Sequence, residues 1–193
     1  MEFKKIQLNG FKSFAEKTNF LIEDGLTGIV GPNGCGKSNI VESLRWAMGE
    51  TSAKSMRGSG MEDVIFSGTS NKASKNIAEV SVTIANENNE GPIQFREINE
   101  VNIRRKIEKD KGSKFYINDK EVRARDAQMF FADLSTGAHS PSMISQGRIG
   151  ALVTARPTDR RAILEEAAGI SGLHVRRHEA ELRLNAAENN LKR

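Results

Sequence analysis

Residues 31–38, GPNGCGKS, carry the most specific chemical pattern in the chain, because they fit G-x-x-x-x-G-K-[ST] at every fixed position. Glycines allow backbone N–H groups to close around phosphate oxygens without clashes from Cβ atoms. Lys37 follows the last glycine and is expected to reach the β- and γ-phosphates, while the Ser38 hydroxyl is expected to bind Mg²⁺. The pattern therefore predicts a loop that binds a nucleoside triphosphate together with magnesium.

Two elements have to position this loop. The apolar stretch LTGIV, residues 26–30, predicts a strand before it, and residues 37–48 show the apolar spacing of a helix after it. The positive end of such a helix would point at the bound anion. This strand–loop–helix order is the structural context in which the motif binds phosphate.

The remaining elements follow from periodicity. Alternating apolar residues predict strands, which lie near residues 3–8, 18–22, 61–68, 77–84, 101–108 and 113–119. Helical spacing is found over residues 125–134 and from Thr158 to the end, with Thr158 or Asp159 as the N-cap. These elements predict an α/β domain with a helical extension.

The helical extension contains a short heptad seam. Its residues are spaced alternately by four and three, and they are Leu173, Arg177, Ala180, Leu184, Ala187 and Leu191. We interpret this seam as the start of a coiled coil, with an amphipathic helix packed on the domain as the alternative.

Composition narrows the functional class. The 193 residues contain no apolar run of membrane-spanning length and no signal-peptide core, and the single cysteine fits a reducing compartment, so a cytoplasmic protein without a membrane partner is expected. The net charge is +4, but residues 101–125 alone hold nine basic and four acidic residues. Such a concentration favours a polyanionic partner, with a solvated hairpin as the alternative.

The sequence lacks a second half of the catalytic machinery. ATP hydrolysis by an ATPase with this kind of phosphate loop needs an apolar strand that ends in a carboxylate, followed by a glutamate that acts on water. The only candidate, MFFAD ending at Asp133, is followed by leucine and has helical spacing. We therefore expect MFFAD to lie in a core helix. The chain is then expected to bind a triphosphate but to lack the carboxylates that its hydrolysis requires.

Five stretches together resemble the N-terminal head segment of bacterial SMC (structural maintenance of chromosomes) proteins. They are IQLNGFKSFAEKT, GIVGPNGCGKSNIVESLRWAMGE, SAKSMRGSGMEDVIFSGT, MISQGRIGALV and RPTDRRAILEEAAGISG. The resemblance implies the N-terminal lobe of an ABC-type P-loop ATPase head over residues 1–168, with a mixed sheet plus an antiparallel sheet. It further implies a neck that begins a coiled-coil arm over residues 169–193.

The resemblance also implies roles for individual residues. ATP would be held by Pro32, Asn33, Gly34, Cys35, Gly36, Lys37, Ser38 and Asn39. Gln146 would contact Mg²⁺ and the attacking water, and Arg57 would act like an arginine finger. Lys12 would lie over the nucleotide, and Asp63 would approach its base or ribose. From the residues alone, Gln146, Arg57 and Lys12 also fit ordinary surface positions.

The partners implied by the resemblance include the rest of the same protein. Walker B, the signature sequence and the catalytic glutamate would come from its C-terminal half, and two heads would form a homodimer around two ATP molecules. DNA would bind without sequence readout, with the basic region from Arg104 to Arg125 and Lys54 as the candidates. A kleisin subunit with its accessory protein would bridge the heads of this nucleoid-associated ATPase, which acts in chromosome condensation and segregation.

Two alternatives stay open at this stage. One is a DNA double-strand-break repair ATPase with the same split head, and the other is a DNA clamp that needs only ATP binding. In each case the 193 residues alone are expected not to turn over ATP.

Overall fold

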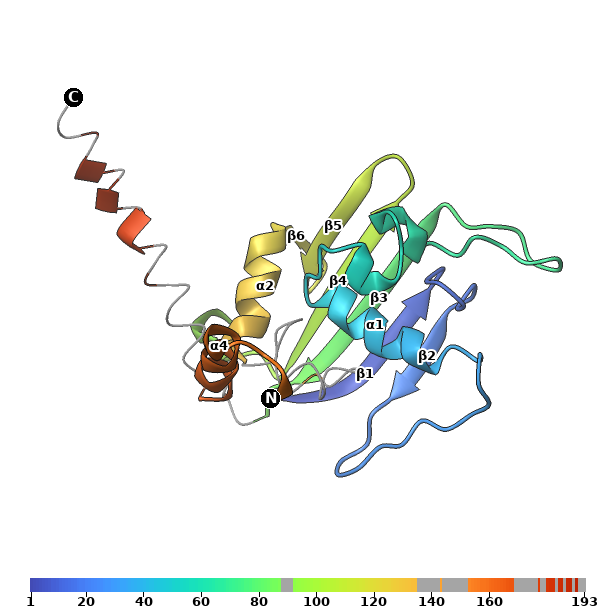
Figure 1. Ribbon diagram of the computed structural model, residues 1–193, viewed down its shortest axis with the longest axis horizontal. Helices are drawn as coiled ribbons and strands as arrows, with labels where there is room; N and C mark the ends of the chain where they lie inside the picture. Colours follow the sequence, from blue (N-terminus) through green and yellow to red (C-terminus); the bar gives the residue numbers. More distant parts are fainter. Residues whose placement is uncertain are drawn as a thin grey trace.

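The sheet of the molecule is six-stranded and antiparallel throughout, with strand order β2-β1-β3-β4-β5-β6 (Figure 1). The structure is a computed structural model, which describes residues 1–87, 92–134, 143 and 153–168 and isolated positions between 177 and 190. The strands are β1 Glu2–Asn9, β2 Thr18–Leu21, β3 Ile77–Ala85, β4 Glu100–Glu108, β5 Gly112–Ile117 and β6 Lys120–Val122.

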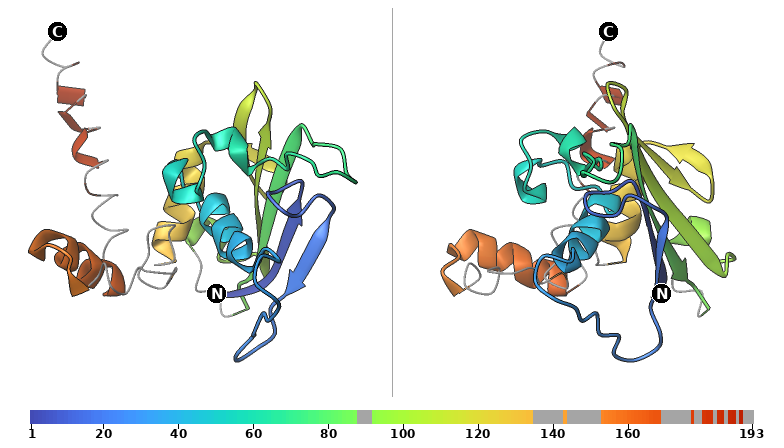
Figure 2. Two further views of the ribbon diagram at one scale, coloured as in Figure 1. Left: turned by 45° about the vertical axis from the view of Figure 1, so that its right-hand side comes forward. Right: turned by 90° about the vertical axis from the view of Figure 1, so that its right-hand side faces the viewer.

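Helices α1 and α2 lie on the same side of this sheet (Figure 2). The described helices are α1 Lys37–Ala47, α2 Ala124–Asp133 and α4 Pro157–Ala167, with short 3₁₀ turns η1 Lys54–Met56, η2 Met61–Val64 and η3 Ile93–Phe95. No helix in the described part of the chain has the length and apolar character needed to cross a bilayer.

The core forms between this side of the sheet and the two helices. Along β3, Ala78, Val80, Val82 and Ile84 each keep 1% exposure or less, as the alternation in the sequence predicts. Trp46 of α1 and residues Phe130 and Phe131 of α2 join the same cluster. The sheet face and the helices therefore share one apolar core, which fixes the direction of α1.

The opposite side of the sheet is polar and internally bonded. Asn102 on β4 donates from its amide nitrogen to the Thr83 hydroxyl at 3.1 Å, and the Ser81 hydroxyl donates to the Asn102 amide oxygen at 3.0 Å. These hydrogen bonds between neighbouring strands satisfy polar side chains that are largely buried.

Two predicted strands are wrong. Residues 26–30 form no strand, and Leu26 and Val30 are 100% and 95% exposed. An apolar pattern makes a strand only when a neighbouring edge accepts its hydrogen bonds, and none of the six strands pairs with this segment. Residues 61–64 form the 3₁₀ turn η2, after which Ile65 makes only an isolated bridge to Phe11.

Other expectations are confirmed. The structure is α/β, and helix α2 covers MFFAD, so Asp133 ends a helix and not a strand. Of the two sheets expected, the described residues hold the antiparallel one. The predicted N-cap at Thr158 or Asp159 is wrong, because both residues lie inside helix α4, which begins at Pro157, a first-turn position that proline favours. Most of the predicted neck, residues 169–193, lies outside the described residues.

Candidate nucleotide-binding site

The glycines of residues 31–38 adopt the backbone that a phosphate loop requires. Gly34 and Gly36 have φ angles of 85° and 92°, in the left-handed region that other residues rarely adopt. A Cβ atom on Gly36 would also lie 2.4 Å from the Ser13 hydroxyl oxygen. The loop consequently packs against the turn at residues 11–14 through a contact that only glycine permits.

The N-terminus of α1 is suited to an anion. Gly36 is its N-cap, no side chain caps it, and its first turn contains no acidic residue. The 11-residue helix therefore presents backbone N–H groups and the positive end of its dipole to the loop. Ser38, in that first turn, is exposed and could offer its hydroxyl to a metal ion.

Lys37 lies back over the loop that precedes it. Its ammonium group donates to the backbone carbonyls of Gly31 and Pro32 and lies 3.7 Å from the Cys35 sulfur. Phosphate oxygens are stronger acceptors for an ammonium group than peptide carbonyls. The loop, its lysine and the helix N-terminus thus fit a triphosphate with Mg²⁺ in residue type and in backbone geometry.

The structure brings Lys12 and Arg57 together at α1, although they are 45 positions apart in the sequence. Both side chains form ion pairs with Glu42 of α1. Arg57 also donates from Nη2 to the Asn39 side-chain oxygen at 2.8 Å. Sequence reasoning missed Glu42, although a glutamate among the apolar positions of a predicted helix was an available signal.

Asp63 is engaged with its own loop. Its Oδ2 atom accepts hydrogen bonds from the backbone N–H groups of Ser59 and Gly60, at 2.6 and 2.9 Å, and from the Ser59 hydroxyl at 2.8 Å. The Gly60 bond, followed by those from Ser59, lowers the pKa of the Asp63 carboxyl below its usual value. These contacts show Asp63 ordering the loop after Arg57, and its approach to a nucleotide stays a prediction. Gln146, the expected ligand of Mg²⁺, lies outside the described residues.

Several basic side chains of the region from Arg104 to Arg125 form ion pairs with acidic side chains of this chain. Arg104 forms ion pairs with Glu79 and Asp119, and Lys111 and Lys114 pair with Glu108 and Glu121. Arg105 is only 3% exposed, so it cannot contact DNA as a surface residue. Among the remaining basic residues of this region, Lys106, Lys109, Lys120 and Arg123 form no ion pair with a described residue.

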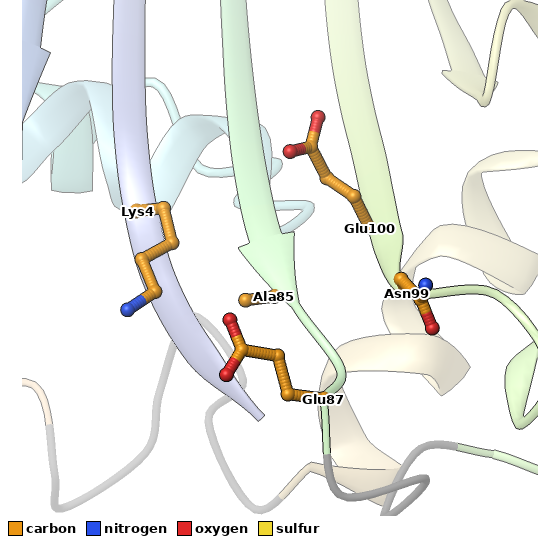
Figure 3. Close-up of a pocket in the computed structure, with 5 residues that line it drawn as sticks. All are labelled: Lys4, Ala85, Glu87, Asn99 and Glu100. Atoms are coloured by element: carbon orange, nitrogen blue, oxygen red, sulfur yellow. The ribbon is translucent and has the colours of Figure 1, made fainter.

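A hollow lies away from the phosphate loop, near the ends of β1, β3 and β4 (Figure 3). It has a volume of about 540 Å³ and is lined by Lys4, Ala85, Glu87, Asn99 and Glu100. Hydrogen bonds to Asp24 and Glu2 raise the pKa of Lys4 and engage its ammonium group. With its only cation already paired and two carboxylates in its lining, this hollow does not suit a triphosphate.

The chain is similar to known proteins both in sequence and in fold. The "Chromosome partition protein Smc" of Rhodopseudomonas palustris is 55% identical over all 193 residues, which span 17% of that relative's length. A solved "Smc head domain with an extended coiled coil bound to the C-terminal domain of ScpA", derived from Pyrococcus furiosus, superposes with a TM-score of 0.81 at 32% identity. That match covers 100% of this chain and 48% of the other.

A third match comes from a study of "ATP-driven dimerization and DNA stimulated activation of SMC ATPases", with a TM-score of 0.74 at 32% identity. It covers 86% of this chain and 99% of the solved one. The fold is therefore that of SMC ATPase heads. A family model described as "RecF/RecN/SMC N terminal domain" matches residues 2–148. The chain belongs to the RecF/RecN/SMC N-terminal domain family, as a segment of the SMC head.

Proposed function

We propose that this chain is the ATP-binding lobe of a split ATPase head in a chromosome partition protein. The observation that carries the proposal is the loop at residues 31–38, with left-handed Gly34 and Gly36 and with Lys37 lying over it at an uncapped helix N-terminus. The 55% identity with a chromosome partition protein favours this function over DNA repair.

Each part of the loop has a role in this proposal. Lys37 exchanges the carbonyls of Gly31 and Pro32 for phosphate oxygens, and the N–H groups from Asn33 to Asn39 surround the phosphates. Ser38, together with Gln146, holds Mg²⁺. The bound ATP supplies the phosphoanhydride that is cleaved, and the residues of this chain bind and orient it.

The exposed segment at residues 26–30 supports a second lobe. Leu26 and Val30 are almost fully exposed directly before the loop, and an apolar strand sequence with no partner is costly to leave in water. In the proposal, the C-terminal half of the protein pairs with this segment and supplies the catalytic carboxylates. Residues 1–168 would form the first lobe, and residues 169–193 would begin the arm.

The proposed assembly is a cytoplasmic, nucleoid-associated homodimer that acts on DNA. Lys106, Lys109, Lys120 and Arg123 are the proposed phosphate contacts, because their charges are not paired within the described residues. A kleisin subunit with its accessory protein is the proposed bridging partner, since the solved Smc head from Pyrococcus furiosus is bound to ScpA.

Nucleotide binding by the full-length protein tests this function. Lys37→Ala removes the charged donor to the phosphates and is expected to weaken MgATP binding by at least about tenfold, measured by calorimetry, and to abolish hydrolysis. Lys17→Ala removes an exposed lysine on the segment before β2 and should leave the affinity unchanged. Equal affinity in the Lys37→Ala variant and the wild type would refute the proposal.

A further inference from the structure

Glu42 places a carboxylate close to a loop that is built to bind an anion. It lies on α1, four residues after Ser38, which corresponds to about 6 Å along the helix axis. It is only 8% exposed, so its charge is poorly screened by water. By its charge alone, Glu42 would repel a triphosphate. A buried carboxylate at this position therefore needs nearby cations that offset both its burial and this repulsion.

The two oxygens of Glu42 bind two different cations. Oε2 accepts from the Lys12 ammonium group, which also donates to the backbone carbonyl of Met56. Oε1 pairs with Nε of Arg57. The side chains of Lys12 and Glu42 are 13% and 11% exposed, so this pair is largely removed from solvent. Glu42 thereby links the turn at residues 11–14 to the loop that carries Arg57.

The two residues that pair with Glu42 have an unusual backbone conformation. Lys12 and Arg57 have φ angles of 46° and 54°, in the left-handed region. The other described non-glycine residues with positive φ are Asp110, Asn118 and Asp119, which lie in hairpin turns where Asp and Asn are well tolerated. Lysine and arginine have no such local preference, so the ion pairs with Glu42 help to hold two strained positions.

Arg57 keeps donors available while it is held. Its Nε pairs with Glu42 and its Nη2 donates to Asn39, which in turn donates to the Ser13 hydroxyl at 2.9 Å. A guanidinium group has five N–H donors, so three remain after these two contacts. The Arg57 side chain is 59% exposed, which leaves those donors accessible to an anion.

We propose that Glu42 is a positioning residue, which orients Arg57 toward the triphosphate bound at residues 31–38 and fixes Lys12 beside it. This inference rests on the proposed function. It predicts that loss of the negative charge at Glu42 weakens nucleotide binding, whereas simple repulsion between Glu42 and the phosphates predicts that the same change strengthens it. The two accounts therefore differ in sign.

The test uses the full-length protein with a double-mutant cycle. Glu42→Gln keeps the shape and removes the charge, and it is expected to weaken binding of a non-hydrolysable MgATP analogue by about fivefold to tenfold. In an Arg57→Ala background the same change should alter the affinity by less than about twofold, because the residue through which Glu42 acts is absent. Glu16→Gln, at an exposed ion pair with Lys72, is the matched control and should have no effect.

Arg57→Lys provides a second test that does not depend on the folding of a variant at a buried position. This change keeps the positive charge but removes the planar guanidinium group, which contacts Glu42 and Asn39 at the same time. Binding of the MgATP analogue should therefore weaken almost as much as in Arg57→Ala. Tighter or unchanged binding in Glu42→Gln, an undiminished effect in the Arg57→Ala background, or full affinity in Arg57→Lys would each overturn the inference. Lys37→Ala separates the two claims, because its failure to weaken binding would refute the proposed function itself.

Discussion

The two ends of α1 differ in almost every physical respect. At the C-terminal end, Trp46 and Ala47 are fully buried, and Trp46 lies 5.5 Å from Phe11 between ring centroids. At the N-terminal end, residues 31–35 are exposed, and the Lys37 ammonium group donates to carbonyls of its own loop. One end of the helix is fixed in the core, and the other is left accessible for a ligand.

Arg105 of β4 anchors the buried end. Its Nη1 atom donates to the carbonyls of Trp46 and Glu50, both at 2.7 Å, and its Nε donates to the Ser113 hydroxyl at 2.7 Å. Its guanidinium carbon lies 4.5 Å from the Trp46 ring centroid and 4.6 Å from that of Phe115. Burial lowers the pKa of Arg105 to about 10, so it remains charged at neutral pH and favours the negative end of the helix dipole.

The largest expected effect is an opposite response to two substitutions, one at Arg105, which contacts the C-terminal end of α1, and one at Ser38, in its first turn. Arg105→Met removes the buried cation that donates to the Trp46 and Glu50 carbonyls and should lower the free energy of unfolding by about 3 kcal/mol, measured in urea, while the affinity for MgATP changes by less than about twofold. Ser38→Ala should change the free energy of unfolding by less than about 0.5 kcal/mol and reduce the dependence of ATP binding on Mg²⁺.

Either variant can show that the two ends of α1 do not have separate roles in stability and in nucleotide binding. If Arg105→Met weakened nucleotide binding as strongly as it lowered stability, the two ends of the helix would not be independent. If Ser38→Ala destabilised the fold by as much as Arg105→Met, the exposed end would also be part of the core.

A smaller effect is expected at Asp63, in the loop after Arg57. Its hydrogen bonds to Gly60 and Ser59 lower its pKa below the usual 3.8, so the stability it contributes is present above that value and is lost as pH falls through the lowered pKa. Asp63→Asn should therefore be slightly less stable than the wild type near pH 6, and this difference should disappear in acid. A difference that is independent of pH between about 6 and 2, measured by urea unfolding, would exclude this role of the charge.

The sequence predicted those features whose cause is local. Alternation along 77–84 identified β3 and its buried side, and the glycine spacing identified the loop at residues 31–38. Strand β6 was missed, although Asn118 and Asp119, both with positive φ, form a turn that such residues favour. That short turn was an available signal for the added strand.

The remaining features depend on contacts between distant segments. Residues 26–30 have a strand pattern, but pairing requires an edge that the described chain does not offer. The sequence pattern places Arg105 in a basic region and Glu42 in a helix, whereas the structure buries both and gives them specific partners. Such roles are set by tertiary packing, which periodicity does not encode.

Hydrogen exchange at the two ends of α1, measured in the full-length protein with and without MgATP, tests the central claim most directly. At an MgATP concentration near the wild-type Kd, binding at the loop predicts slower exchange of the backbone N–H groups of residues 33–39 and unchanged exchange at residues 44–50. The slower exchange at residues 33–39 should be largely lost in Lys37→Ala. Unchanged exchange over residues 33–39 in the wild type at a saturating MgATP concentration, or equal protection of wild type and Lys37→Ala near the wild-type Kd, would contradict the account.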